Sequence, residues 1–136
     1  MDYSNILNKN KEEVIKEVIN KTKIELDGLT KERTCKVYSD YISHNLHLNN
    51  ILHRNIDTKD YDYNYSHKFC IVPNEKDYYL IDLTYSQFNN YEFVDLLIDG
   101  YTDITKDELK RYMDIVGKSK KDINMDTLLF GKGRSK

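Results

Sequence analysis

The pattern of apolar and polar positions predicts an amphipathic helix near the start of the chain. Between Asn10 and about Leu26 the apolar positions recur at helical spacing, and acidic residues stand in the first turn, where the helix dipole favours them. The predicted buried positions are Val14, Ile15, Val18, Ile19 and Thr22. Gly28 follows and suits a turn that ends the helix.

A second helix is predicted to begin at Thr34 or Cys35 and to run to about residue 52. One stripe of this segment is formed by Cys35, Tyr38, Ile42 and Leu46, with Ser39 and Asn49 alongside. Thr34 is a suitable N-cap, because its hydroxyl can accept from a backbone N–H of the first turn. The Cys35 thiol is therefore expected in the first turn of a helix.

The middle of the chain predicts two strands joined by a turn. Residues 66–72 and about 78–84 are rich in aromatic and β-branched residues, and the polar stretch "PNEKD" separates them. Pro73, the only proline, falls where the first strand is expected to stop. The preceding stretch, residues 53–66, shows no clear period and is interpreted as a loop.

The last third predicts one further helix. Residues 91–101 form a short apolar segment that fits either a helix or a strand. Over residues 105–117, Thr105 and Glu108 form a capping box, and Gly117 is expected to close the helix. The final residues, 131–136, are expected to fray.

These elements predict a single α+β domain over residues 1–136. Its parts are an N-terminal helix at about 10–26, a core at about 30–100 and a C-terminal helix at about 105–117. A chain of 136 residues can bury enough surface for a real core.

Composition and charge narrow the classes of function. Hydrophobic residues make up 39% of the chain and charged residues 32%, with a net charge of −2 and both signs mixed. Such a balance gives no global basic field for nucleic acid. A basic tail at residues 117–136 leaves nucleic-acid binding as an alternative, which would be steeply salt-dependent. No apolar run is long enough to span a membrane, and the N-terminus lacks the apolar core of a signal peptide. The expected compartment is the cytosol, or the outside after export without a classical signal peptide.

Three residues on these elements suggest thiol chemistry. A cysteine acts as a nucleophile through its thiolate, and a helix N-terminus or a neighbouring imidazolium lowers the thiol pKa. Cys35 at a helix start has the first of these, and His67 on a strand that crosses the helix end could supply the second. Asp82 on the paired strand could accept from the other ring nitrogen and fix the tautomer.

The hairpin spacing supports the pairing of His67 with Asp82. With the turn centred near residues 74–75, the two residues fall opposite each other or one diagonal apart, within reach of a hydrogen bond. Asp82 stands among apolar residues, where a carboxylate without a partner would be costly to bury. Strand alternation sends Lys68 and Cys70 to the face opposite to His67, so Cys70 is expected to be a core thiol.

No metal or cofactor is expected. His44 and His47 share a helical face with Asp40, and His53 follows, but no Cys-x-x-Cys or His-Glu-x-x-His pattern accompanies them. These histidines are interpreted as solvated surface residues.

The order Cys35, His67, Asp82, with the motif Asp82-Leu83-Thr84 inside "HKFCIV…YYLIDLTYSQF", resembles the papain-like and transglutaminase-like superfamily. It is especially similar to small bacterial effector or toxin cysteine proteases and glutamine deamidases, over about residues 30–90. The resemblance implies a core in which the catalytic helix packs on a small antiparallel sheet. It also implies an acyl-enzyme mechanism on a protein or peptide amide, as a peptidase, a deamidase or an acyltransferase, without a cofactor.

The chain also departs from that family. No glutamine for an oxyanion hole precedes Cys35, and no tryptophan follows Cys35 or His67. Tyr63 and Tyr65 could line a substrate groove or pack over the core, and Gln87 ends the family-like stretch; all three are candidate substrate-binding residues. The alternative is a catalytically inactive relative that acts as a protein-binding or immunity module.

Overall fold

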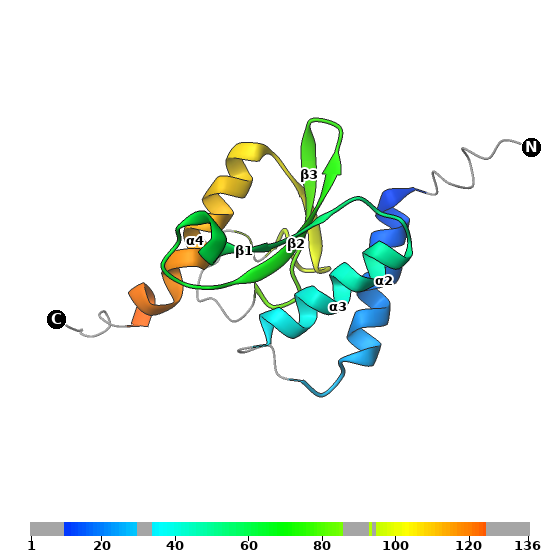
Figure 1. Cartoon of the computed structure of the whole chain (residues 1–136), viewed down its shortest axis with the longest axis horizontal. Helices are drawn as coiled ribbons and strands as arrows, with labels where there is room; N and C mark the ends of the chain where they lie inside the picture. The colour runs from blue at the N-terminus through cyan, green and yellow to red at the C-terminus, as the bar shows by residue number, and fades with distance from the viewer. Residues whose placement is uncertain (1–9, 30–33, 86–92, 94, 125–136) are drawn as a thin grey trace, which may run out of the picture.

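A four-stranded antiparallel sheet separates two helices on one face from a third helix on the other (Figure 1). The computed structural model describes residues 10–29, 34–85, 93 and 95–124. Its elements, in chain order, are α2 (Lys11–Glu25), α3 (Cys35–Leu48), β1 (Arg54–Asp57), the 3-10 helix η1 (Thr58–Tyr61), β2 (Lys68–Asn74), β3 (Asp77–Ile81), β4 (Tyr101–Ile104) and α4 (Lys106–Asn124). The strand order is β1-β2-β3-β4. The predicted α+β class and the small antiparallel sheet are confirmed.

Helix α2 forms as its apolar spacing predicts. Asn10 is the N-cap, and its side chain accepts from the Glu12 N–H at 2.8 Å. The buried residues of the helix are Val14, Ile15, Val18, Ile19 and Thr22. All five predicted positions therefore face the core.

Helix α3 begins at Cys35 with Thr34 in the N-cap position, as predicted, but the Thr34 side chain makes no capping hydrogen bond, so the expected bond from its hydroxyl to the first turn was wrong. It buries Tyr38, Ser39, Ile42, Asn45 and Leu46 against α2 and the sheet. The helix ends at Leu48, earlier than expected. Asn50, just beyond it, has a positive φ of 59°, a conformation that asparagine tolerates better than most residues.

Strands β2 and β3 form the predicted hairpin. Asn74 pairs with Asp77 and Cys70 with Ile81, so the turn is the two residues between Asn74 and Asp77. Pro73 lies inside β2, opposite Tyr78, so the expectation that the strand stops there was wrong. Alternation separates the faces: Cys70 packs towards α2 and α3, whereas Phe69 packs towards α4.

Two short strands were not predicted. β1 lies within the segment interpreted as a loop and pairs with β2, with Ile56 opposite Phe69. β4 follows the undecided segment and pairs with β3, with Ile104 opposite Tyr78. Each has four residues, too few for a visible period, and each is defined by its pairing with the hairpin.

Helix α4 starts as predicted and continues further. In the capping box, Glu108 accepts from the Thr105 N–H at 2.8 Å, and Thr105 Oγ1 accepts from the Glu108 N–H at 3.1 Å. Gly117 does not end the helix, which runs to Asn124. Gly117 is instead a packing position, because a Cβ there would lie 2.6 Å from Cγ of Tyr63. In the part of the chain that the structure describes, no helix is long and apolar enough to cross a membrane.

Candidate active site

Cys35 is the first residue of α3 and is half-buried. Its thiol hydrogen bonds with the side chain of His67 and with the backbone N–H of Lys68. The start of a helix also directs unsatisfied backbone N–H groups towards this position. The first turn of α3 therefore lies beside the start of β2.

His67 directly precedes β2 and is almost fully buried, with 1% of its surface exposed. Thr58, a buried residue of η1, holds its backbone from both sides. The His67 N–H donates to Thr58 Oγ1 at 2.9 Å, and the His67 carbonyl accepts from the Thr58 N–H at 3.1 Å. Thr58 was not singled out from the sequence, because its role depends on η1, which was not predicted.

Asp82 directly follows β3 and is 4% exposed. Its Oδ2 lies 2.7 Å from Nε2 of His67, and its Oδ1 accepts from the N–H and the hydroxyl of Thr84 at 2.8 and 2.9 Å. A carboxylate only accepts, so His67 carries its proton on Nε2. Nδ1 is then the ring nitrogen that can exchange a proton with Cys35.

The three titratable groups shift one another's pKa. Burial raises the pKa of the Cys35 thiol, but the hydrogen bonds from His67 and the Lys68 backbone and the His67 charge outweigh burial, and the pKa lies below its ordinary value. Burial lowers the pKa of His67, but the charge and hydrogen bond of Asp82 raise it to about 9. These opposite shifts favour a thiolate at Cys35 beside an imidazolium at His67.

The pKa of the Asp82 carboxyl group is also set by burial on one side and by charge and hydrogen bonds on the other. Burial raises the pKa of Asp82, but the His67 charge and the hydrogen bonds from His67, Tyr112 and Thr84 hold the pKa below its ordinary value. An ionised carboxylate in this position keeps the imidazole oriented and charged.

Tyr112 of α4 is a site residue that sequence reasoning missed. Its hydroxyl donates to Asp82 Oδ2, the oxygen that also accepts from His67. Its ring is fully buried and meets the rings of Phe69 and Phe93 edge-on. A signal was present: Tyr112 lies on the apolar face of a clear helix, and a buried tyrosine hydroxyl needs a partner.

The candidate substrate-binding tyrosines are placed by α4. The Tyr63 hydroxyl donates to Asp114 Oδ1 at 2.6 Å, and its ring lies over Gly117. Burial and the charge of Asp114 raise the pKa of Tyr63 to about 12. The Tyr65 N–H donates to the Gly117 carbonyl at 2.8 Å. The structure thus attaches this loop to α4, while Gln87 lies outside the described residues.

Cys70, His44, His47 and His53 are the cysteine and histidines outside the candidate triad of Cys35, His67 and Asp82. Cys70 is fully buried beside Ser39, and burial raises the pKa of its thiol to about 12. His44 and His47 are exposed on α3, whereas Nε2 of His53 lies 2.7 Å from Ser43 Oγ. The described residues contain no group of three or more histidine, cysteine or acidic side chains that could hold a metal ion.

The pocket that Cys35 lines with Ser39, Lys68 and Thr84 is close-packed and has no space for a water molecule.

In comparisons with known proteins, no family model, curated protein or solved structure matches this chain. The chemistry of the site must therefore be argued from its own residues.

Proposed function

We propose that this protein is a thiol enzyme that cleaves or transfers at an amide bond, with Cys35 as the nucleophile, His67 as the proton carrier and Asp82 as the group that orients His67. The observation that carries the proposal is the buried His67–Asp82 pair at 2.7 Å with the Cys35 thiol hydrogen-bonded to the same imidazole. Together these contacts connect a nucleophile, a base and an orienting acid by hydrogen bonds, in that order.

In the proposed first step, the Cys35 sulfur attacks the amide carbonyl carbon and forms a tetrahedral intermediate. The imidazolium of His67 then gives its proton to the amide nitrogen, the C–N bond breaks, and the amine or ammonia leaves. The acyl group remains on sulfur as a thioester. Water or an amine then attacks the thioester while His67 takes up its proton, and the Cys35 thiolate is released.

The position of Cys35 favours a substrate that is presented from solvent. The thiol is half-buried, and the pocket behind it is closed, so the amide would meet the exposed side of the sulfur. The amides of a protein side chain or a peptide satisfy this requirement. The resemblance to effector and toxin peptidases and deamidases agrees with this proposed substrate class.

The test is alkylation of the native protein with iodoacetamide between about pH 5 and pH 9, with mass spectrometry to locate the label. We expect fast labelling of Cys35 well below the ordinary thiol pKa, because the thiolate is already formed. Cys70 is the internal control and should label slowly, since it is buried and its pKa is raised. His67→Ala should return Cys35 to an ordinary pH profile.

The second stage separates the proposed reactions. Release of ammonia from a glutamine-containing protein would identify a deamidase, cleavage of peptide amides a peptidase, and incorporation of an added amine an acyltransferase; Cys35→Ser should abolish each. If Cys35 is inert to iodoacetamide or titrates like a free thiol, the enzyme proposal is wrong. The alternative of an inactive binding module would then take its place.

A further inference from the structure

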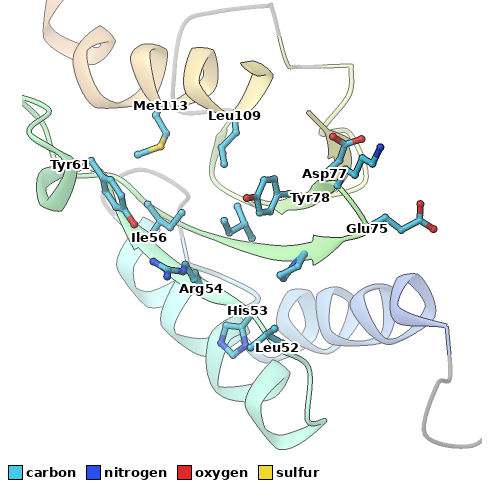
Figure 2. Close-up of a pocket in the computed structure, with 13 residues that line it drawn as sticks. Leu52, His53, Arg54, Ile56, Tyr61, Glu75, Asp77, Tyr78, Leu109 and Met113 are labelled. Atoms are coloured by element: carbon cyan, nitrogen blue, oxygen red, sulfur yellow. The ribbon is translucent and has the colours of Figure 1, made fainter. Parts of the chain in front are cut away.

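A cavity of about 530 Å³ lies on the α4 side of the sheet and extends from Ile56 and Tyr61 to the hairpin turn (Figure 2). His67 precedes the first residue of β2, whereas the cavity reaches Pro73 near the end of that strand. Its volume is within the range of about 300–1,000 Å³ that small-molecule sites occupy. None of Cys35, His67 and Asp82 lines the cavity, so it is not part of the proposed thiol site.

The body of the cavity is apolar. Ile56 of β1 lies on the sheet side, and Leu109 and Met113 project from α4 on the other side (Figure 2). Ile71 of β2 also lines the cavity. Tyr112, which lies between Leu109 and Met113 in the sequence, packs its ring against Phe69 and Phe93 and does not line the cavity. A hydrocarbon body would fill this space at a favourable transfer free energy.

Three polar groups at the cavity have their hydrogen-bond donors available. Arg54 is exposed and has no carboxylate partner among the described residues, and the hydroxyls of Tyr61 and Tyr78 have no hydrogen bond within that same part of the chain. A guanidinium recognises a carboxylate with two parallel N–H donors, and phenol hydroxyls can add to it. The ligand that matches these donors therefore carries acceptors and a negative charge.

The charged residues at the other end of the cavity determine in which orientation an anionic ligand would bind. Glu75, Lys76 and Asp77 of the hairpin line the cavity as well, two carboxylates and one ammonium, and Glu75 and Asp77 lie on the side away from Arg54 and Tyr61 (Figure 2). His53 does not compete for the anion, because its two ring nitrogens lie 2.7 Å from Ser43 Oγ and 2.8 Å from the Ile51 carbonyl. An anionic group is thus attracted to the guanidinium at the Arg54 end, whereas at the hairpin end it meets two carboxylates against the one ammonium of Lys76.

We propose that this cavity is a binding site for a small apolar carboxylate. The carboxylate pairs with Arg54 near Tyr61, and the hydrocarbon chain lies between the sheet residues Ile56 and Ile71 and the α4 residues. This inference rests on the cavity alone and does not depend on the proposed activity of Cys35.

The test is a titration of the full ¹⁵N-labelled chain with octanoate, followed by backbone NMR, with octan-1-ol as the uncharged ligand of equal chain length. We expect saturable shifts at the N–H groups of Ile56, Ile71, Tyr78, Leu109 and Met113. We also expect octanoate to bind at least about tenfold more tightly than octan-1-ol, because only octanoate forms a charge-assisted pair.

Two variants sharpen the test. Arg54→Gln should reduce the affinity for octanoate to that for octan-1-ol. Lys59→Gln removes the same charge from an exposed position of η1 outside the cavity and should leave the affinity unchanged. Equal affinity of the wild-type chain for the two ligands, shifts that map elsewhere, or shifts that never saturate would each overturn the inference.

Discussion

Asp82 is the residue on which the candidate site depends, because four donors reach its two oxygens. His67 and Tyr112 donate to Oδ2, and the N–H and hydroxyl of Thr84 donate to Oδ1. A fully buried carboxylate is tolerated only when its acceptor capacity is filled. The same four bonds fix its orientation, and the His67 ring is oriented through it.

We predict that Tyr112→Phe lowers the free energy of unfolding by about 1–3 kcal/mol, because a buried carboxylate loses a donor while the ring packing is kept. Tyr38→Phe is the matched control: it is also buried, but its hydroxyl makes only a weak contact, 3.5 Å from the Leu29 carbonyl. Urea unfolding at neutral pH measures both. Equal losses in the two variants would contradict a specific role for the Tyr112 hydroxyl.

At the scale of elements, the long amphipathic segments form from their own periodicity, and the short ones form by pairing. The two-residue turn fixes the register of β2 and β3 and therefore brings His67 and Asp82 to the same end of the hairpin. β1 and β4 extend the sheet on either side. Gly117 lies inside α4, and the absence of a side chain there leaves room for the ring of Tyr63.

We predict that Gly117→Ala destabilises the protein, although alanine is the better helix former by about 1 kcal/mol. The new methyl group would lie 2.6 Å from Cγ of Tyr63, so the ring must move and its 2.6 Å bond to Asp114 is lost. The expected net loss is about 1–3 kcal/mol in urea unfolding.

Tyr63→Ala provides the control for that prediction. In this background no ring opposes the methyl group, so Gly117→Ala should be neutral or stabilising, and the double-mutant cycle isolates the clash. If Gly117→Ala destabilises both backgrounds equally, the contact with Tyr63 is not the cause.

At the scale of the whole molecule, the two faces of the sheet position different residues of the candidate site. The cluster with α2 and α3 places Cys35, and the cluster with α4 places Tyr112 beside Asp82. His67 and Asp82 lie beside the first residue of β2 and the last of β3, and the apolar cavity extends from Ile56 to the hairpin turn without including either residue. The ionisation of the triad is therefore linked to the folding of all three layers.

This linkage predicts how stability depends on pH. The raised pKa of His67 contributes stability that is complete below its ordinary value of 6.5 and is lost as the pH rises towards about 9. The lowered pKa of Cys35 acts in the opposite direction, because the stability that it contributes to the fold is gained as the pH rises towards the ordinary thiol value of 9.0. In the wild-type chain the two contributions oppose each other over that interval.

Cys35→Ser should therefore reveal the His67 contribution. We expect its free energy of unfolding to fall by on the order of 2 kcal/mol between pH 6.5 and pH 9, more than in the wild type. Adding His67→Gln should flatten the profile. Urea unfolding across this pH range measures all three proteins, and a flat profile in Cys35→Ser would show that Asp82 without Cys35 does not raise the pKa of His67.

The sequence by itself determined the elements whose signal is local. The period of Val14 to Thr22, the stripe from Cys35 to Leu46 and the capping box at Thr105 each rest on neighbouring residues of one segment. It also predicted that His67 and Asp82 lie within reach of each other, opposite or one diagonal apart, because a turn within "PNEKD" brings both to the same end of the hairpin. The exact register, with Asn74 opposite Asp77, was decided by the structure.

Only the tertiary structure decided what depends on contacts between distant segments. β1 and β4 are too short to carry a pattern and become strands beside the hairpin. The packing of Tyr63 on Gly117 of α4 joins two residues that are 54 positions apart along the chain. The bond from Tyr112 to Asp82 and the cavity at Arg54 arise where α4 packs on the sheet, and no spacing within one segment encodes that packing.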